Sequence, residues 1–268
     1  MIKAIRTCLL LICAVQTLLA IAFFFQFPLA VSLWPFEGTT PLTYIFVSSI
    51  FLAAAAATFW AVASSTYGAL VGVALDYITI MIPLSIFSFQ LGASSGNPSL
   101  TTYGVACALG ALFGLGLLLW SRRFPMPATP RMPGLVRWSF VVFIIALLIV
   151  STRLILKTPN VIPWKITPEL SVVIGWMFLG AAAYFIFSLV RPSWANSGGQ
   201  LAGFLAYDVV LIWPFLQRLP TVAPEQRVGL IIYTAVVAYS GLLAFYFLFL
   251  NKQTRLWRTR RVSSLAAS

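Results

Sequence analysis

The stretch that decides the fold is residues 67–91, YGALVGVALDYITIMIPLSIFSFQL. It is long and apolar enough to cross a bilayer, which takes about 20 residues of helix, yet it places the carboxyl of Asp76 near the middle of the crossing. A charged side chain at that depth costs about 3 kcal/mol on insertion scales, and such residues usually face a cavity or a transport path. Asp76 is therefore a candidate functional residue.

The same design returns in the second half of the chain. Two glycines precede Asp76 and a proline follows it, and the same order surrounds Asp208; these residues are Gly68, Gly72 and Pro83 in the first copy and Gly199, Gly203 and Pro214 in the second. We predict that each proline breaks its helix, because a prolyl nitrogen has no hydrogen for the carbonyl four residues earlier, which is that of Thr79 in the first copy. A carbonyl freed at that depth needs protein, water or a ligand as its partner.

Composition defines the class of protein. Hydrophobic residues make up 61% of the 268 residues and charged residues only 8%, with a net charge of +12. A soluble protein of this size carries far more charge, so we expect an all-α integral membrane protein. The positive charge lies outside the apolar runs, which indicates topology signals and contact with lipid headgroups rather than nucleic acid.

Eight transmembrane helices are expected. The predicted spans are residues 5–27, two crossings within 41–91 that turn near 64–66, then 101–120, 138–155, 169–190, 198–215 and 228–250. We divide the chain into a first four-helix repeat (1–123), a Pro-rich connector (124–136), a second four-helix repeat (137–251) and a basic tail (252–268). With both termini cytoplasmic, twelve Lys and Arg residues lie inside and five outside, as the positive-inside rule requires in a bacterial inner membrane.

An internal repeat underlies that division. A shift of 131 residues superposes landmarks of the two halves, such as Arg6 on Arg137, Gly68 on Gly199 and Pro83 on Pro214. Four spans per half make the repeats parallel, and sites in such folds lie near the midplane where the halves meet. The two parallel four-helix repeats thus predict a shared site at Asp76 and Asp208.

The order of acid and tyrosine is reversed between the repeats. Asp76–Tyr77 in the first copy meets Tyr207–Asp208 in the second, and neighbouring positions differ by about 100° around a helix. The two acids are therefore not expected on equivalent faces. A symmetric carboxylate pair and a hydrogen bond from each Asp to a Tyr hydroxyl across the interface are both open arrangements.

Two Thr–Pro steps start spans at the outer surface. Thr40 and Thr167 suit the N-cap and the prolines after them suit the first turn. The surrounding stretches, LWPFEGTTPL (33–42) and VIPWKITPEL (161–170), resemble a recurring W-P…T-P-L feature of uncharacterised multi-pass bacterial membrane proteins. The second copy departs from it in the Trp–Pro order and in its inserted Glu169. The resemblance implies a multi-pass fold and no particular activity.

Other motifs favour packing and lipid contact over chemistry. Close helix packing is expected at the glycine pairs Gly68/Gly72, Gly199/Gly203 and Gly110/Gly114. The basic tail, which includes Arg255, Arg258, Arg260 and Arg261, is expected to bind anionic lipid headgroups at the cytoplasmic face. The chain has no His, and Cys8, Cys13 and Cys107 lie apart in apolar runs. We therefore expect no enzyme, no metal and no cofactor.

Two hypotheses for function remain. The first is a transporter-like protein whose protonatable Asp site serves an ion or a small, weakly polar solute. The second is a non-catalytic accessory or scaffold subunit of a larger membrane complex, or a lipid-organising protein. In the second case, both acids are neutral and hold helices together by hydrogen bonds to Tyr, Thr or Ser hydroxyls.

Overall fold

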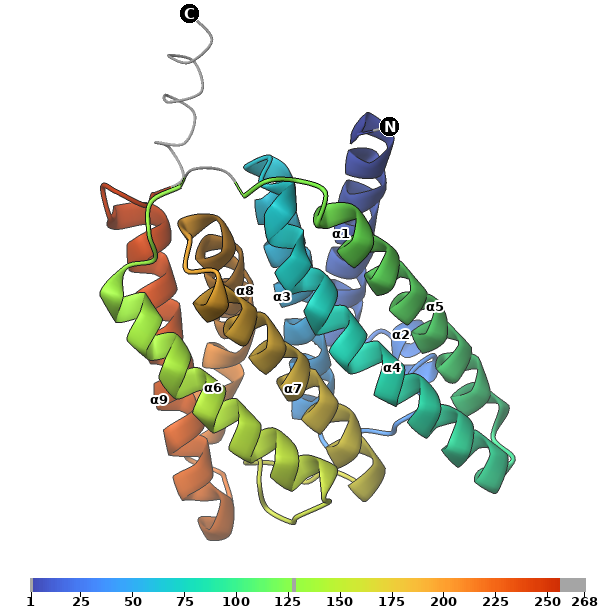
Figure 1. The fold of residues 1–268 in the computed structure, drawn as a ribbon. Helices are drawn as coiled ribbons and strands as arrows, with labels where there is room; N and C mark the ends of the chain where they lie inside the picture. Colours follow the sequence, from blue (N-terminus) through green and yellow to red (C-terminus); the bar gives the residue numbers. More distant parts are fainter. Residues whose placement is uncertain (1, 127–128, 256–268) are drawn as a thin grey trace, which may run out of the picture.

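The computed structural model describes residues 2–126 and 129–255, and eight helices in these ranges are long and apolar enough to span a membrane. Figure 1 shows them side by side. The first helix begins at the end of the bundle where the last helix ends. The eight long helices are α1 (Ile2–Phe24), α3 (Pro41–Ala63), α4 (Leu70–Ser95), α5 (Pro98–Ser121), α6 (Gly134–Ile155), α7 (Pro168–Val190), α8 (Trp194–Arg218) and α9 (Pro224–Phe245). The predicted number of long helices is confirmed for this part of the chain.

Three short helical segments complete the description. Helix α2 (Pro28–Ser32) lies in the connection between the first two predicted spans, a 3₁₀ turn (Tyr67–Ala69) precedes α4, and a π-helical turn (Tyr246–Leu250) extends α9. The connection between the predicted spans 41–91 and 101–120 is shorter than those bounds imply, because α5 already begins at Pro98. Helix α4 reaches Ser95 and ends at Gly96, whose φ of +67° is a left-handed conformation that glycine adopts without strain.

Caps start the helices at one end of the bundle. Thr167 caps α7, and its Oγ1 accepts a hydrogen bond from the Leu170 amide at 3.1 Å. Asn97 caps α5 in the same way through the Ser99 amide, at 2.9 Å. Thr40 is the N-cap residue of α3 but makes no side-chain cap bond, so only the second Thr–Pro step uses its hydroxyl as predicted.

The expected helix breaks at Pro83 and Pro214 are wrong. Both residues lie inside helices that continue past them, α4 to Ser95 and α8 to Arg218. A proline removes one hydrogen bond from the helix, and in a packed bundle the neighbouring turns and helices hold the remainder in place. The proline therefore does not act here as a terminator.

The two halves of the chain interlock at the centre of the bundle. Helix α3 packs along α8 and α4 packs along α7, whereas α3 touches α4 only slightly and α7 touches α8 only slightly. The outer helices lie on these four: α1 on α3, α5 on α4, α6 on α7 and α9 on α8. The inner helices of each half therefore pack extensively against the inner helices of the other half, in addition to the outer helices of their own.

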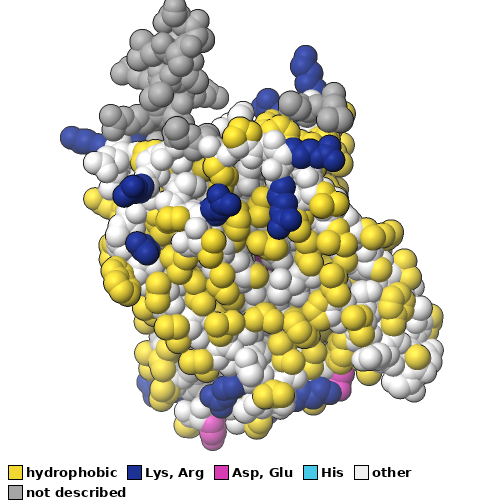
Figure 2. All heavy atoms as spheres, viewed as in Figure 1, with side chains coloured by type: hydrophobic (Ala, Val, Ile, Leu, Met, Phe, Trp, Pro, Cys, Tyr) yellow, Lys and Arg dark blue, Asp and Glu magenta, His cyan; other side chains and the backbone are white. Residues whose placement is uncertain are grey.

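The surface matches a membrane environment. Figure 2 shows hydrophobic side chains around the middle of the visible face, with Lys and Arg side chains gathered toward its two ends. Lipid tails solvate such an apolar belt, and basic residues at its borders reach the headgroups. The described part of the chain is accordingly that of a multi-pass membrane protein in contact with the bilayer.

Candidate functional site

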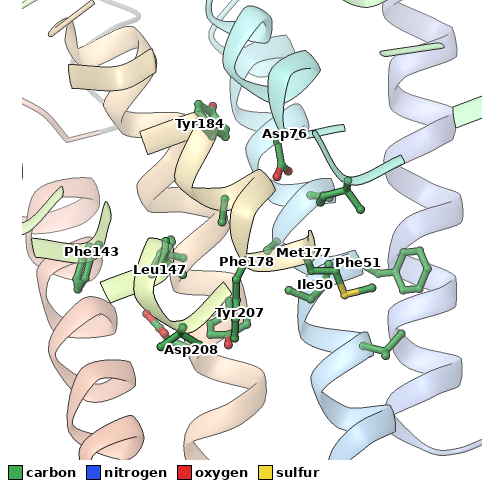
Figure 3. A pocket seen from close by; sticks show the side chains of 18 of the residues that line it. Ile50, Phe51, Asp76, Phe143, Leu147, Met177, Phe178, Tyr184, Tyr207 and Asp208 are labelled. Atoms are coloured by element: carbon green, nitrogen blue, oxygen red, sulfur yellow. The ribbon is translucent and has the colours of Figure 1, made fainter. Parts of the chain in front are cut away.

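A cavity of about 430 Å³ lies inside the bundle, and every long helix contributes to its wall. Figure 3 shows it between the inner helices, with Asp76 and Asp208 on different sides. Its wall is mainly aliphatic and aromatic; its polar side chains are Gln16, Asp76, Tyr77, Tyr103, Tyr184, Gln200, Tyr207, Asp208, Tyr233 and Ser240. None of the described residues that line it is Lys or Arg.

The cavity reaches one end of the bundle more closely than the other. Trp34 and the segment 161–163, which lie in the α1–α3 and α6–α7 connections, form part of its wall. Toward the opposite end the indole rings of Trp60 and Trp194 meet edge to face, with centroids 6.4 Å apart. The connection-lined end is the one that the positive-inside rule predicts to lie outside.

Asp76 stands on α4 and faces α7. A Cβ placed on Gly180 would lie 2.5 Å from Asp76 Oδ1, so the carboxyl occupies space that only a glycine on α7 leaves free. The side chain is half-buried and points into the pocket in Figure 3. No described residue donates a hydrogen bond to it, which leaves the carboxylate available to the cavity.

Tyr184, four residues after Gly180 on α7, is a polar neighbour of Asp76. Its ring lies directly over Gly72 of α4, and its Oη would be 2.8 Å from a Cβ on Gly199 of α8. The hydroxyl is buried and has no hydrogen-bond partner among the described residues. Two of the predicted packing glycines thus form the seat of one buried tyrosine.

Asp208 stands on α8 and faces α9. It is only 3% exposed, and a Cβ on Gly241 would lie 3.3 Å from the Asp208 Cβ. The Ser240 hydroxyl is close enough to interact with the carboxyl, but it donates to the Val236 carbonyl at 2.8 Å. Neither carboxyl oxygen has a hydrogen-bond partner by geometry in the described part of the chain.

The two tyrosines next to the acids are bonded elsewhere. The Tyr77 hydroxyl accepts a hydrogen bond from Gln16 of α1, and the Tyr207 hydroxyl shares one with Tyr233 of α9. The expected bond from each Asp to a Tyr hydroxyl is therefore not formed. The two acids do not form a symmetric pair either, since one faces α7 and the other faces α9.

An exchange of faces explains the reversed order in the sequence. Asp76 and Tyr207 both face an inner helix of the other half: Asp76 faces α7, and Tyr207 packs against Phe46 of α3 at a ring distance of 6.1 Å. Tyr77 and Asp208 both face the outer helix of their own half: Tyr77 lies 6.0 Å from the Phe113 ring of α5, and Asp208 lies against α9.

The other predicted residues lie around the cavity or away from it. Gly203, at the α3 contact, lines the cavity; Thr79, Pro83 and Pro214 do not. Gly68, Gly110 and Gly114 lie in close contacts outside it, against Phe124, Met81 and Tyr77 respectively. Arg255 is exposed, and Arg258, Arg260 and Arg261 lie outside the described residues.

Sequence reasoning missed six polar residues of the cavity, namely Gln16, Tyr103, Tyr184, Gln200, Tyr233 and Ser240. The two glutamines carried a usable signal, because an uncharged amide within a predicted span needs a partner inside the bundle. Tyr184 and Tyr233 carried none, since tyrosine is common at both membrane interfaces. Only the packing shows that their hydroxyls lie in the interior.

The chemistry open to this site is the binding of a proton or a cation. Asp76 and Asp208 are the only lining groups whose ordinary range of titration lies at acidic to neutral pH. No group of three or more His, Cys, Asp or Glu side chains in the described ranges could hold a metal ion. Comparison of the chain with protein-family models, with curated proteins and with solved structures finds no match.

Proposed function

We propose that this chain is a transporter-like, non-enzymatic protein of the bacterial inner membrane, with both termini cytoplasmic. Its intramembrane site is formed by Asp76 and Asp208 and serves an ion or a small, weakly polar solute. The observation that carries the proposal is that one carboxyl from each half lines a single cavity and neither has a hydrogen-bond partner by geometry among the described residues. Acids that served only to hold helices together would be partnered by neighbouring hydroxyls.

The energetic cost of these acids supports a functional reason for keeping them. A buried polar group without a partner costs about 1–3 kcal/mol, and Asp208 is 3% exposed with both oxygens unpaired. The tyrosines beside the acids bond to Gln16 and Tyr233 instead. Packing alone does not account for either carboxyl.

The helix contacts support two parallel repeats around the cavity. The α1–α3, α4–α5 and α3–α8 contacts of the first repeat have counterparts in the α6–α7, α8–α9 and α7–α4 contacts of the second. A pseudo-two-fold axis along the membrane normal then passes between the four inner helices. A rocking movement of one half against the other, at the α3–α8 and α4–α7 interfaces, would open the cavity at the Trp60–Trp194 end and close it at the other end. Alternating access requires such a movement.

The test uses purified protein in vesicles filled with a pH-sensitive dye. Na⁺, K⁺ or benzyltrimethylammonium is added outside, and the internal pH is followed for the wild type, Asp76→Asn and Asp208→Asn. We expect a pH response to at least one of these cations in the wild type and at least a tenfold slower response in each variant. Glu225→Gln, an exposed acid in the first turn of α9, is the control and should respond as the wild type does.

Two results would overturn the transporter proposal in favour of an accessory subunit. One is an unchanged vesicle response in both Asp variants. The other is the absence of any response together with stoichiometric co-purification of other membrane subunits from native membranes. Modification by a hydrophobic carbodiimide gives an independent test of whether Asp76 and Asp208 are accessible, because the reagent modifies a carboxyl only where it can reach it.

A further inference from the structure

The charge of the cavity wall determines the sign of the group it can accept. Two carboxyls face or border the cavity, and no described lining residue is Lys or Arg. An anion placed there would have no counter-charge and would meet two acids, which is costly in a low-dielectric interior. A cation placed there gains a counter-charge and relieves the cost of the unpaired carboxyls.

The wall is also suited to a charge that is spread over an organic group. Ten aromatic side chains contribute to it, among them Phe143, Phe178, Tyr184 and Tyr207. Aromatic faces attract cations by roughly 0.5–2 kcal/mol each when water is excluded. Met81 and Met177 add flexible side chains that adapt to the shape of an apolar molecule.

Size and coordination argue against a bare inorganic ion. A volume of about 430 Å³ lies within the range of sites for drug-sized molecules. A dehydrated metal ion needs several oxygen ligands around it, whereas the contacts of Asp76 on α7 are Gly180 and Tyr184. An organic cation loses little hydration on entry, because its charge is already shielded by carbon.

Asp76 is better placed than Asp208 to meet such a ligand. Asp76 is half-buried and points into the pocket, while Asp208 is 3% exposed and lies against Gly241 of α9. Tyr184, with its unpaired hydroxyl, stands beside Asp76. The counter-charge and an aromatic face are therefore adjacent at this side of the cavity.

We infer that the cavity binds a hydrophobic, monovalent organic cation, with Asp76 as its counter-charge and the aromatic wall as its apolar seat. This inference rests on the transporter-like function proposed above and specifies its substrate class. Asp208 contributes to the negative potential of the cavity without contacting the ligand.

The test measures binding of two ions of the same shape and opposite charge. Tetraphenylphosphonium and tetraphenylborate are titrated into the purified protein in nanodiscs, with protein-free nanodiscs subtracted, and benzyltrimethylammonium serves as a smaller cation. We expect saturable binding of at least one cation and at least tenfold weaker binding of tetraphenylborate. Asp76→Asn should weaken cation binding at least tenfold, Asp208→Asn less than threefold, and Glu225→Gln should leave it unchanged.

A bound cation should also protect Asp76 from the hydrophobic carbodiimide, which peptide mass spectrometry reports residue by residue. The inference is overturned if neither cation binds saturably, if the borate binds as tightly as the phosphonium, or if Asp76→Asn binds like the wild type. Should Na⁺ or K⁺ drive an Asp76-dependent pH response in vesicles while neither organic cation binds, the transporter proposal stands and only the substrate class is wrong. If neither organic cation binds, no cation produces a pH response and other membrane subunits co-purify stoichiometrically, both fail together.

Discussion

The Asp–Tyr pair of α4 and the Tyr–Asp pair of α8 carry the same two side chains in opposite order, and their surroundings differ. Asp76 meets an inner helix at Gly180 and points into the cavity, whereas Asp208 meets an outer helix at Gly241 and is nearly sealed. The repeated pattern places one acid within each of these two long helices. The helix that each acid faces decides whether a ligand can reach it.

The tyrosines show the same division. Tyr77 is tied to α1 by Gln16, and Tyr207 is tied to α9 by Tyr233. Each bond anchors an inner helix to a peripheral one, so the hydroxyls are used for structure and the carboxyls are left unpaired. In both repeats, the tyrosine therefore links two helices, while the neighbouring aspartate is free of hydrogen bonds by geometry among the described residues.

The largest expected effect on stability is at Gly72 of the first repeat, where the Tyr184 ring packs against the glycine. Gly72→Ala would drive a methyl group into the Tyr184 ring, which is held from the other side near Gly199. We expect a loss of about 1–3 kcal/mol in the free energy of unfolding, typical of overpacking, measured by thermal unfolding in detergent. Gly203→Ala, whose Cβ would lie 3.0 Å from the Ala53 carbonyl oxygen, should cost less.

The matched control for these substitutions is Gly116→Ala on α5, where nothing lies within 4 Å of the added Cβ. Its stability should be unchanged or slightly raised. Equal losses at Gly72 and Gly203 would contradict the asymmetry between the two copies.

The next effect concerns the sealed acid. Asp208→Leu keeps the branched shape of the side chain and removes two unpaired buried oxygens, so we expect a gain of about 1–2 kcal/mol in the free energy of unfolding. Asp76→Leu should change stability less, because Asp76 is half-buried. Thermal unfolding of the two variants measures the difference, and Asp208→Ala separates it from any overpacking by leucine. Loss of stability in both Asp208 variants would show that this carboxyl is structural.

A smaller effect is expected from the hydroxyl bonds. Tyr233→Phe leaves the Tyr207 hydroxyl without its partner, and Gln16→Leu does the same to Tyr77. Each variant should lose about 1 kcal/mol of stability, measured by the same unfolding experiment. A loss of stability in only one of the two variants would mean that the Gln16–Tyr77 and Tyr207–Tyr233 hydrogen bonds contribute unequally to stability.

The smallest effect is at the surface, where the second copy has an ion pair at the start of α7. Lys157 and Glu169 lie 3.8 Å apart and are 47% and 39% exposed. Lys157→Ala should lower the free energy of unfolding by less than about 0.5 kcal/mol, since exposed pairs are screened by water and salt. The unfolding experiment at low and high salt checks this, with Lys165→Ala as control. A large, salt-sensitive loss would assign this pair a structural role.

Much of the frame was predictable from the sequence, and the detail of the site was not. The turn near 64–66 and the N-cap positions of Thr40 and Thr167 follow from local chemistry and are present. The breaks at Pro83 and Pro214 were wrong because the loss of one helical bond is local, while the continuity of α4 and α8 depends on the helices around them. The bonds of Tyr77 and Tyr207 were missed because their partners lie on other helices.

The sequence by itself determined eight helices able to cross a membrane and an acid in the interior of two of them. It could do so because crossing a bilayer depends on apolar length, which is a sum over consecutive residues. The tertiary structure alone decided that α3 pairs with α8 and α4 with α7. It also decided that Asp76 is half-buried at the cavity while Asp208 is only 3% exposed, and that Tyr184 lies near Asp76. These features depend on which faces of distant helices meet, and a glycine opposite a carboxyl is recognisable only once the two helices are in contact.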